Sequence, residues 1–173
     1  NDIGNFRVYY DGLPVLIDIG RGTYTRRTFS NERYDIWFNR SDYHNVPTIK
    51  GMTQSAGGEF QARNVDYSKS GSYARISMDI APSYPAEAGV ESWKRTIRLN
   101  RGKNVQISDE ARLTSQGEIV QHLMTCYPAE VTAPGQLIIH YKGKDGQSRD
   151  FVVTYDAKKL EAHVEKIELG LPE

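Results

Sequence analysis

The sequence predicts an all-β protein, an antiparallel β-sandwich of roughly a dozen strands with little helix. Short runs rich in β-branched and aromatic residues recur along the chain, and Gly, Asn and Ser separate them at even spacing. No amphipathic helix of three turns is visible. The length of 173 residues is sufficient for a buried core, so we expect a single domain over residues 1–173.

The clearest element is a hairpin in which NFRVYY (5–10) and PVLIDIG (14–20) flank the turn DGL. The strands expected after it share a β-branched or alternating pattern and cover 33–39, 48–54, 59–67, 73–81, 92–100, 105–113, 118–125, 136–143, 149–156 and 163–169. Tight turns are expected at SKSG (68–71) and RGKN (101–104). Residues 156–163 are expected to form one helical turn.

The positions of several side chains in these strands predict whether they are buried or exposed. Trp37 and Phe38 are expected on opposite faces of the strand over 33–39, because side chains alternate along a strand. Trp93 and Cys126 are expected in the core. His140 is expected to face solvent without a partner.

The composition narrows the classes of partner. Lys and Arg total 22 and so do Asp and Glu, so no global field would attract nucleic acid or a membrane surface, and neither partner is expected. Cys126 is the only cysteine and cannot close an internal disulfide. The chain opens without Met, directly in strand-like sequence, and we expect it to be part of a longer protein.

Asp18 and His44 are the two strongest candidates for a functional site. Asp18 ends the apolar run PVLID, where an unpaired buried carboxylate is costly and needs an arginine, backbone donors or a cation. Asp-x-Gly is equally typical of a turn at the end of a strand. His44, in NRSDYHNVPTI (39–49), has the same two interpretations, as a metal ligand or as a hydrogen-bonding turn residue.

The opening NDIGNF, the run YYDGLPVLIDIGRGTYT and the segment RYDIWFNRSDYHNVPTI together resemble the start of the C-terminal β-sandwich domain of heparinase II/III-like polysaccharide lyases. The resemblance is strongest over residues 1–54. It implies that the chain is the C-terminal part of a lyase that cleaves uronic-acid-containing glycans, such as heparan sulfate, heparin or alginate, by β-elimination. The main catalytic residues would then lie in an N-terminal helical toroid, a partner of this domain, so no catalytic residue is assigned within the chain.

The resemblance also implies a zinc ion. Asp18 and His44 match two of its ligands, and a histidine just before Asn1 would be the third. An imidazole nitrogen and a carboxylate oxygen are both ligands that suit zinc. Because two ligands bind a metal weakly, we expect incomplete zinc binding and no lyase activity from the chain alone.

Four residues are expected to contact substrate. Arg21 in GRGTY can pair with a carboxylate or sulfate in bidentate fashion, Tyr24 and Tyr34 can stack on or donate to sugar, and Asn1, together with Asp2, would shape the cleft edge. Arg21 also has a plainer interpretation as an exposed loop residue, and Tyr24 and Tyr34 as residues of core or surface packing. The alternative function is a non-catalytic carbohydrate-binding or structural module. Because the expected substrates are long polysaccharides or their large fragments, which are found outside the cytoplasm, we expect a secreted or periplasmic bacterial protein.

Overall fold

The computed structural model describes residues 1–20 and 22–168, and it confirms the prediction of an all-β antiparallel fold with little helix. The strands in this part of the chain are β1 (Val8–Tyr10), β2 (Leu13–Leu16), β3 (Pro47–Ile49), β4 (Arg63–Lys69), β5 (Tyr73–Asp79), β6 (Val90–Asn100), β7 (Asn104–Leu113), β8 (Ile119–Gln121), β9 (Ala129–Ala133), β10 (Gln136–Lys142) and β11 (Ser148–Thr154). Its helices are short 3-10 helices, η1 (Arg27–Phe29), η2 (Asn31–Asp35), η3 (Trp37–Asn39), η4 (Ser41–Tyr43), η5 (Ala81–Ser83) and η6 (Ala86–Ala88). None of these described helices has the length and apolar character needed to cross a membrane.

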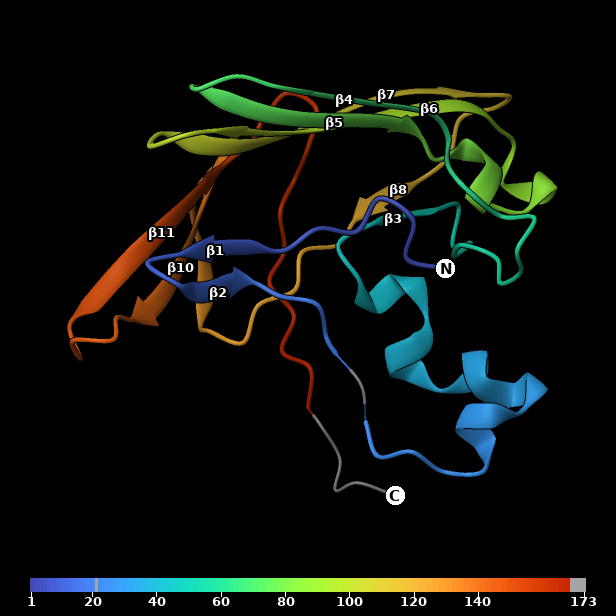
Figure 1. Cartoon of the computed structure of the whole chain (residues 1–173), viewed down its shortest axis with the longest axis horizontal. Coiled ribbons are helices and arrows are strands. Elements are labelled where there is room, and N and C mark those ends of the chain that lie inside the picture. The colour runs from blue at the N-terminus through green and yellow to red at the C-terminus, as the bar shows by residue number, and fades with distance from the viewer. Residues whose placement is uncertain (21, 169–173) are drawn as a thin grey trace.

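The largest sheet is an antiparallel meander in the order β4-β5-β6-β7. Tight connections at 70–72 and 101–103 join its two outer pairs of strands, in agreement with the turns predicted at SKSG and RGKN. In Figure 1 this sheet covers the top of the molecule. The other layer is divided into three small sheets, β1-β2, β3-β8 and β11-β10-β9, rather than one continuous sheet.

The core lies between the large sheet and these smaller sheets. One cluster gathers around Trp93, which is 3% exposed, and includes Ile49 from β3 and Ile80 after β5. The second cluster joins the β1-β2 hairpin to Ile139 on β10, with Ile97 of β6 packed against it. The prediction for Trp93 is therefore confirmed.

The prediction of a strand over 33–39 is wrong, because η2 and η3 occupy this segment. The hydroxyl of Ser30 accepts a hydrogen bond from the N–H of Glu32 and caps η2. In η2 and η3, backbone N–H groups donate to the carbonyl of the residue three positions earlier, which is the 3-10 pattern. Trp37 consequently packs edge-on against Phe38, with ring centroids 5.7 Å apart, instead of pointing to the opposite face. The apolar residues of this segment form a local aromatic cluster and not a two-faced strand.

Three other differences lie in the C-terminal half. The strand β9, Ala129–Ala133, was missed because its sequence AEVTA has little apolar alternation. Residues 163–168 form no strand. Cys126 is exposed and not buried, since it lies in the connection between β8 and β9 rather than in a strand. The helical turn expected at 156–163 is present, with the N–H of Leu160 donating to the carbonyl of Asp156 at 2.9 Å.

Asn45 is the buried side chain that holds the N-terminal segments together. Its Nδ2 donates to the carbonyl oxygens of Phe6, at 2.7 Å, and Ile17, at 2.8 Å. Its Oδ1 accepts the backbone N–H of Met124 at 2.6 Å, and its own N–H donates to Oδ1 of Asn5 at 3.0 Å. Asn45 is 0% exposed, so these groups depend on one another and not on water.

Arg95 connects this junction to the large sheet. It is fully buried and forms a bidentate pair with Asp109, with N–O distances of 2.9 and 2.6 Å. Its Nη1 donates to the carbonyls of Gly4, at 3.2 Å, and Asn45, at 3.0 Å, and its Nη2 donates to Gln121. The buried guanidinium is thus fully paired, which offsets the cost of removing it from water.

The substitution Asn45→Asp should destabilise the protein strongly. The carboxylate has nearly the same shape but cannot donate, so the carbonyls of Phe6 and Ile17 lose their partner and face a buried charge. We expect a loss of about 2–4 kcal/mol in the free energy of unfolding, measured by urea denaturation. The control Asn31→Asp, at an exposed site, should change it by less than about 0.5 kcal/mol. Equal effects for both substitutions would contradict the role of Asn45.

His140 has two partners, contrary to the prediction that it has none. On β10, its Nδ1 lies 2.7 Å from Oδ1 of Asp150 on β11, and its Nε2 lies 3.1 Å from Oε1 of Glu130 on β9. Only the protonated ring can donate to both carboxylates. These hydrogen bonds, to Asp150 and then to Glu130, raise the pKa of His140 above its usual value.

The stability contributed by His140 should therefore depend on pH. Because its pKa is higher in the folded than in the unfolded protein, the contribution is complete below about pH 6.5 and is lost as the pH rises through the folded-state pKa. The free energy of unfolding of the wild type should therefore converge on that of H140Q as the pH rises from about 6.5 through the folded-state pKa of His140. The double variant D150N/E130Q should show a smaller pH dependence than the wild type. A difference between wild type and H140Q that grows with pH would refute this assignment.

Candidate metal centre

Asp18 follows the last residue of β2 by two positions, in a tight Asp-x-Gly turn. The N–H of Gly20 donates to Oδ1 of Asp18 at 2.8 Å. Gly20 has a φ of +81°, in the left-handed region that favours glycine. The turn interpretation of this motif is thus geometrically correct, and it leaves Oδ2 of Asp18 available to other partners.

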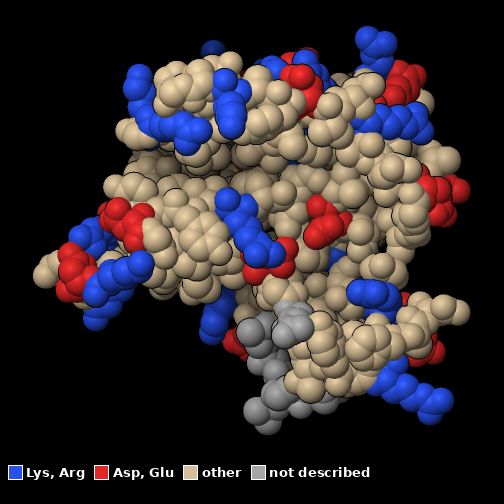
Figure 2. Space-filling model, viewed as in Figure 1, with Lys and Arg blue, Asp and Glu red and all other residues tan. Residues whose placement is uncertain are grey.

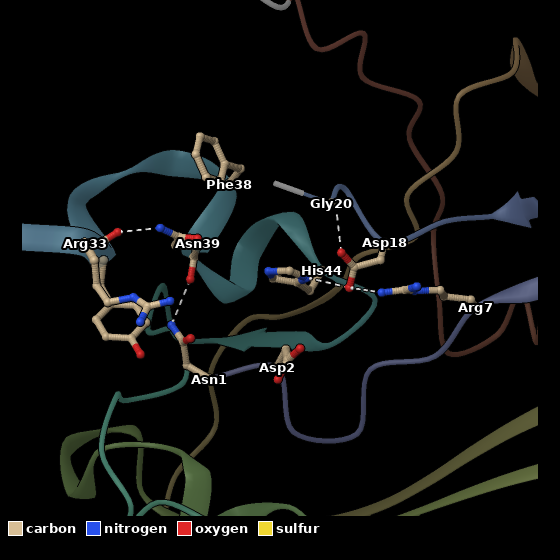
Figure 3. Close-up of a pocket in the computed structure, with 10 residues that line it drawn as sticks. Asn1, Asp2, Arg7, Asp18, Gly20, Arg33, Phe38, Asn39 and His44 are labelled. Atoms are coloured by element: carbon tan, nitrogen blue, oxygen red, sulfur yellow. Dashed lines mark hydrogen bonds and ion pairs between the residues drawn. The ribbon is translucent and has the colours of Figure 1, made fainter. Parts of the chain in front are cut away.

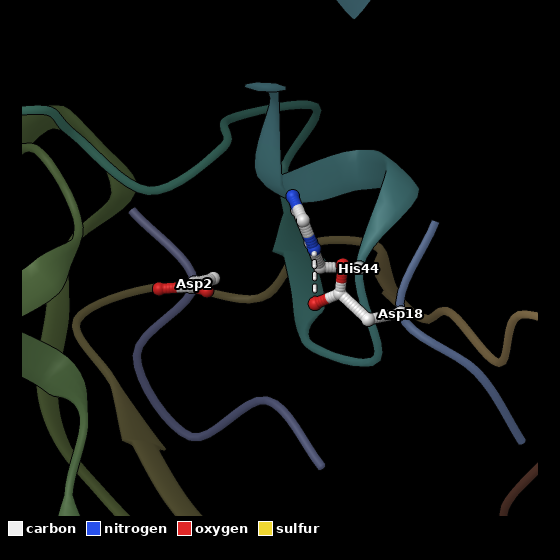
Figure 4. A group of neighbouring side chains, drawn as sticks. All are labelled: Asp2, Asp18 and His44. Carbon is white, nitrogen blue, oxygen red and sulfur yellow. Dashed lines mark hydrogen bonds and ion pairs between the residues drawn. The ribbon is translucent and has the colours of Figure 1, made fainter. Parts of the chain in front are cut away.

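His44 ends η4, and its N–H donates to the carbonyl of Ser41 at 3.1 Å. Its ring points toward Asp18, as Figure 4 shows, with Nδ1 3.3 Å from Oδ2 of the carboxylate. The side chains of His44 and Asp18 are 8% and 10% exposed. The structure therefore brings together the two residues that the sequence analysis selected, although they are 26 positions apart.

Oδ2 of Asp18 has two further neighbours. It accepts Nδ2 of Asn5 at 2.6 Å and lies 3.5 Å from Nη2 of Arg7. Burial is the largest influence on the pKa of Asp18 and raises it, but the N–H of Gly20 and the charges of His44 and Arg7 outweigh it. The pKa of Asp18 is consequently lowered, so the group is a carboxylate at neutral pH, as a metal ligand must be.

Asp2 is the third possible ligand, and it belongs to the chain itself. Asp2, Asp18 and His44 each offer one ligand atom, and these atoms lie within 4.8 Å of one another (Figure 4). Ligands at zinc bonds of about 2.0–2.2 Å are about 3.3 Å apart in a tetrahedron, and the Asp18 to His44 distance already matches this. Asp2 is exposed, and its ligand atom lies no more than 4.8 Å from those of Asp18 and His44. One imidazole and two carboxylates thus fit a zinc ion with an open fourth position.

The three residues border a hollow of about 480 Å³ (Figure 3). The residues around it are Asn1, Asp2, Arg7, Asp18, Gly20, Arg33, Tyr34, Phe38, Asn39 and His44. The η2 and η3 segment forms one wall and is fastened to the N-terminus, because Nδ2 of Asn1 donates to the carbonyl of Asn39 at 3.1 Å. Nδ2 of Asn39 in turn donates to the carbonyl of Arg33 at 2.8 Å.

The structure treats the four expected substrate residues differently. Asn1 and Tyr34 border the hollow, and the guanidinium of Arg33 lies 5.2 Å from the centre of the Tyr34 ring. Tyr24 does not border it and packs against Phe29, with ring centroids 5.5 Å apart. Arg21 lies outside the described residues.

Four residues of the hollow were not predicted from the sequence, namely Arg7, Arg33, Phe38 and Asn39. The assignment of a strand to 33–39 separated Arg33 from Asn39, whereas the two 3-10 helices bring them into contact. One local signal was available. A side chain at Gly22 would overlap the ring of Phe38, so the second glycine of GRG reflects the close approach of this ring.

Arg7 and Arg33 both border the hollow, with Arg7 beside Asp18 and Arg33 on the other side of His44 in Figure 3. Guanidinium groups bind carboxylates and sulfates with two parallel hydrogen bonds. The arrangement can therefore bind a cation at one end and an anionic group beside it.

No protein-family model matches this chain, and no curated protein matches it.

Zinc affinity should increase when Arg7 is replaced by glutamine. Arg7 places a positive charge 3.5 Å from Oδ2 of Asp18, where it opposes an incoming cation. Since the Arg7 side chain is 55% exposed, solvent screens this effect, and we expect R7Q to bind zinc roughly three- to fivefold more tightly in a competition titration with a chelator. The control R27Q removes an arginine paired with Asp35 and should leave zinc affinity unchanged. Weaker binding by R7Q would show that Arg7 supports the ligands instead of competing with the metal.

Proposed function

We propose that this chain is the C-terminal β-sandwich domain of a polysaccharide lyase, holding zinc through Asp18 and His44 and forming one wall of a cleft for a uronic-acid-containing glycan. The observation that carries the proposal is the approach of Nδ1 of His44 to Oδ2 of Asp18, at 3.3 Å, on the border of a hollow that also contains Arg7 and Arg33. Asp2 is the third ligand that the chain can supply. The resemblance over residues 1–54 supplies the reaction class.

β-Elimination begins with removal of the proton at C5 of the uronic acid. Negative charge then develops on the adjacent carboxylate, and the 4-linked oxygen leaves with the bonding electrons to give a C4–C5 double bond. The proton is weakly acidic, so groups that stabilise the developing charge lower the barrier. Arg33 is suited to this task, because its guanidinium borders the hollow and can hold a carboxylate in bidentate fashion.

Other residues of the hollow would position the sugar. Tyr34 borders the hollow and offers a ring for packing and a hydroxyl for hydrogen bonding. Asn1 and Asn39, linked to each other, keep this wall in place. Bound zinc would fix the orientation of Asp18 and His44 and add positive charge to the cleft. The base that removes the proton would come from a helical domain upstream, and the intact enzyme would act outside the cytoplasm, in the periplasm or after secretion.

The second candidate is a non-catalytic carbohydrate-binding or structural module. One observation favours it, namely that Asp18 is fully hydrogen-bonded without a cation. Asn5, Gly20 and Arg7 all contact its carboxylate, in addition to His44. In this case the Asp18–His44 contact would be a structural junction, and substitutions there would change stability but not metal affinity.

Zinc titration of Asp18→Asn and His44→Gln tests the metal site. Each substitution keeps the side-chain shape but removes one ligand, and we expect each to weaken zinc binding at least tenfold. The matched controls Asp35→Asn and His163→Gln alter exposed side chains that are not among the residues bordering the hollow, and these variants should bind zinc as the wild type does. Wild-type affinity in both ligand variants would favour the structural module.

The reaction is tested on the full-length gene product. Incubation with heparan sulfate, alginate or chondroitin should give the ultraviolet absorbance of an unsaturated uronate for at least one glycan. Arg33→Gln should lower kcat/KM roughly tenfold to hundredfold, as expected for loss of one charge-stabilising donor. Absence of unsaturated product with every uronate glycan, while one of them still binds, would favour the carbohydrate-binding module.

A further inference from the structure

A cluster of cations lies at one end of the large sheet, apart from the hollow. It consists of Arg75, Arg98, Arg101 and Lys103, and we call it the hairpin-end patch. The tips of the β4-β5 and β6-β7 hairpins form this end of the sheet (Figure 1). The N–H of Arg101 donates to the carbonyl of Ser72 at 2.9 Å, so the two tips make one continuous surface.

The charge of the patch is only partly balanced locally, because Asp66 pairs with Arg75 and not with the other cations of the patch. Residues 67–76 and 97–107 contain no Asp or Glu, although the chain as a whole carries equal numbers of acidic and basic residues. Figure 2 shows Lys and Arg gathered over the upper left of the molecule, with few acidic side chains among them. A neutral protein therefore presents a localised positive field at this end of the sheet.

The two central arginines are placed where their charges repel. Arg75 on β5 lies directly opposite Arg98 on β6, and like charges in this arrangement destabilise a sheet. Arg75 is compensated by Asp66. Arg98 has no carboxylate partner among the described residues; its guanidinium lies 4.0 Å from the centre of the Tyr73 ring, and its Nε donates to Oδ1 of Asn100 at 2.8 Å. A bound anion would relieve this repulsion.

Uncharged polar groups complete the surface. Nδ2 of Asn100 donates to Oδ1 of Asn104 at 2.7 Å and to Oε1 of Gln106 at 3.1 Å. Amide groups of this kind, between cations, suit a ligand that carries hydroxyl groups beside its charges. Arg98 covers the ring of Tyr73, and Tyr67 pairs with Ile76 on the opposite face of the sheet, so neither ring offers a stacking platform within the patch. Single-stranded nucleic acid, which binds by stacking, is therefore a poorer match than a saccharide.

We propose that the hairpin-end patch is a second binding site, which holds the sulfate and carboxylate groups of an acidic polysaccharide. The choice of an acidic polysaccharide as partner rests on the proposed function, whereas the existence of a polyanion site rests on the patch alone. A long glycan bound here is anchored to the domain independently of the hollow. Affinity for the isolated chain should therefore rise with glycan length.

The test compares two triple variants with the same change in net charge. R98Q/R101Q/K103Q removes three cations of the patch, and R63Q/K94Q/R112Q removes three from the other end of the same sheet, where Asp79, Glu91 and Glu110 lie nearby. Binding to length-matched fractions of heparin, alginate and neutral dextran is measured at low and high salt. We expect the patch variant to bind heparin and alginate roughly tenfold more weakly than the wild type, and the control variant to bind them as the wild type does.

The remaining outcomes separate the possible explanations. R101Q/K103Q, confined to an exposed turn, should give a smaller loss of the same kind with an unchanged melting temperature, which excludes misfolding as the cause. Equal binding by the patch variant and the control variant would overturn the proposal, as would tighter binding of a single-stranded DNA of similar charge than of either glycan. R33Q separates this site from the hollow, because polyanion binding at the patch should be unchanged in this variant. If polyanion binding is retained in R33Q while the protein shows neither zinc binding nor lyase activity, the patch proposal stands and the proposed function fails.

Discussion

Asn45 explains why two residues 26 positions apart meet at one point. Its side chain donates to the carbonyl of Ile17, the residue before Asp18, while its own backbone directly follows His44. One hydrogen bond between neighbours of the two candidate ligands thus sets the distance between them. The same amide holds Phe6 and Met124, so the hairpin, the β3 segment and the connection after β8 share a single buried junction. A rigid junction behind the ligands is what a preorganised metal site requires.

Arg95 connects the Asn45 junction to the large sheet. Through Asp109 and the carbonyl of Asn45, the buried guanidinium links β6 and β7 to the junction that supports the candidate metal centre. The same strand β6 ends in the hairpin-end patch. The chain thus separates its charges by position: a fully paired cation in the core, a cation and carboxylate cluster at the hollow, and unbalanced cations at the hairpin tips. The neutral composition conceals this distribution.

The parts of the fold that sequence could predict are those with a strong local signal. The Asp-Gly turn, the alternating strands around Trp93 and the two tight turns of the large sheet all follow from local residue pattern. The secondary structure of residues 33–39 could not be predicted from the sequence, because their aromatic residues are typical of strands, whereas the polar residues and the Ser30 cap favour 3-10 helices. The contact between Asp18 and His44 came from a resemblance, not from spacing. Arg7, Arg33 and the role of Asn45 depend on tertiary packing, which single residues do not reveal.

Crystals of the chain soaked in zinc, with diffraction measured on both sides of the zinc absorption edge, provide the most direct test of the central claim. The account predicts one anomalous peak at about 2.0–2.2 Å from a carboxylate oxygen of Asp18 and a ring nitrogen of His44, with Arg7 moved away from Asp18. A crystal in which zinc binds elsewhere, while Asp18 keeps its bonds to Asn5, Gly20 and Arg7, would contradict it.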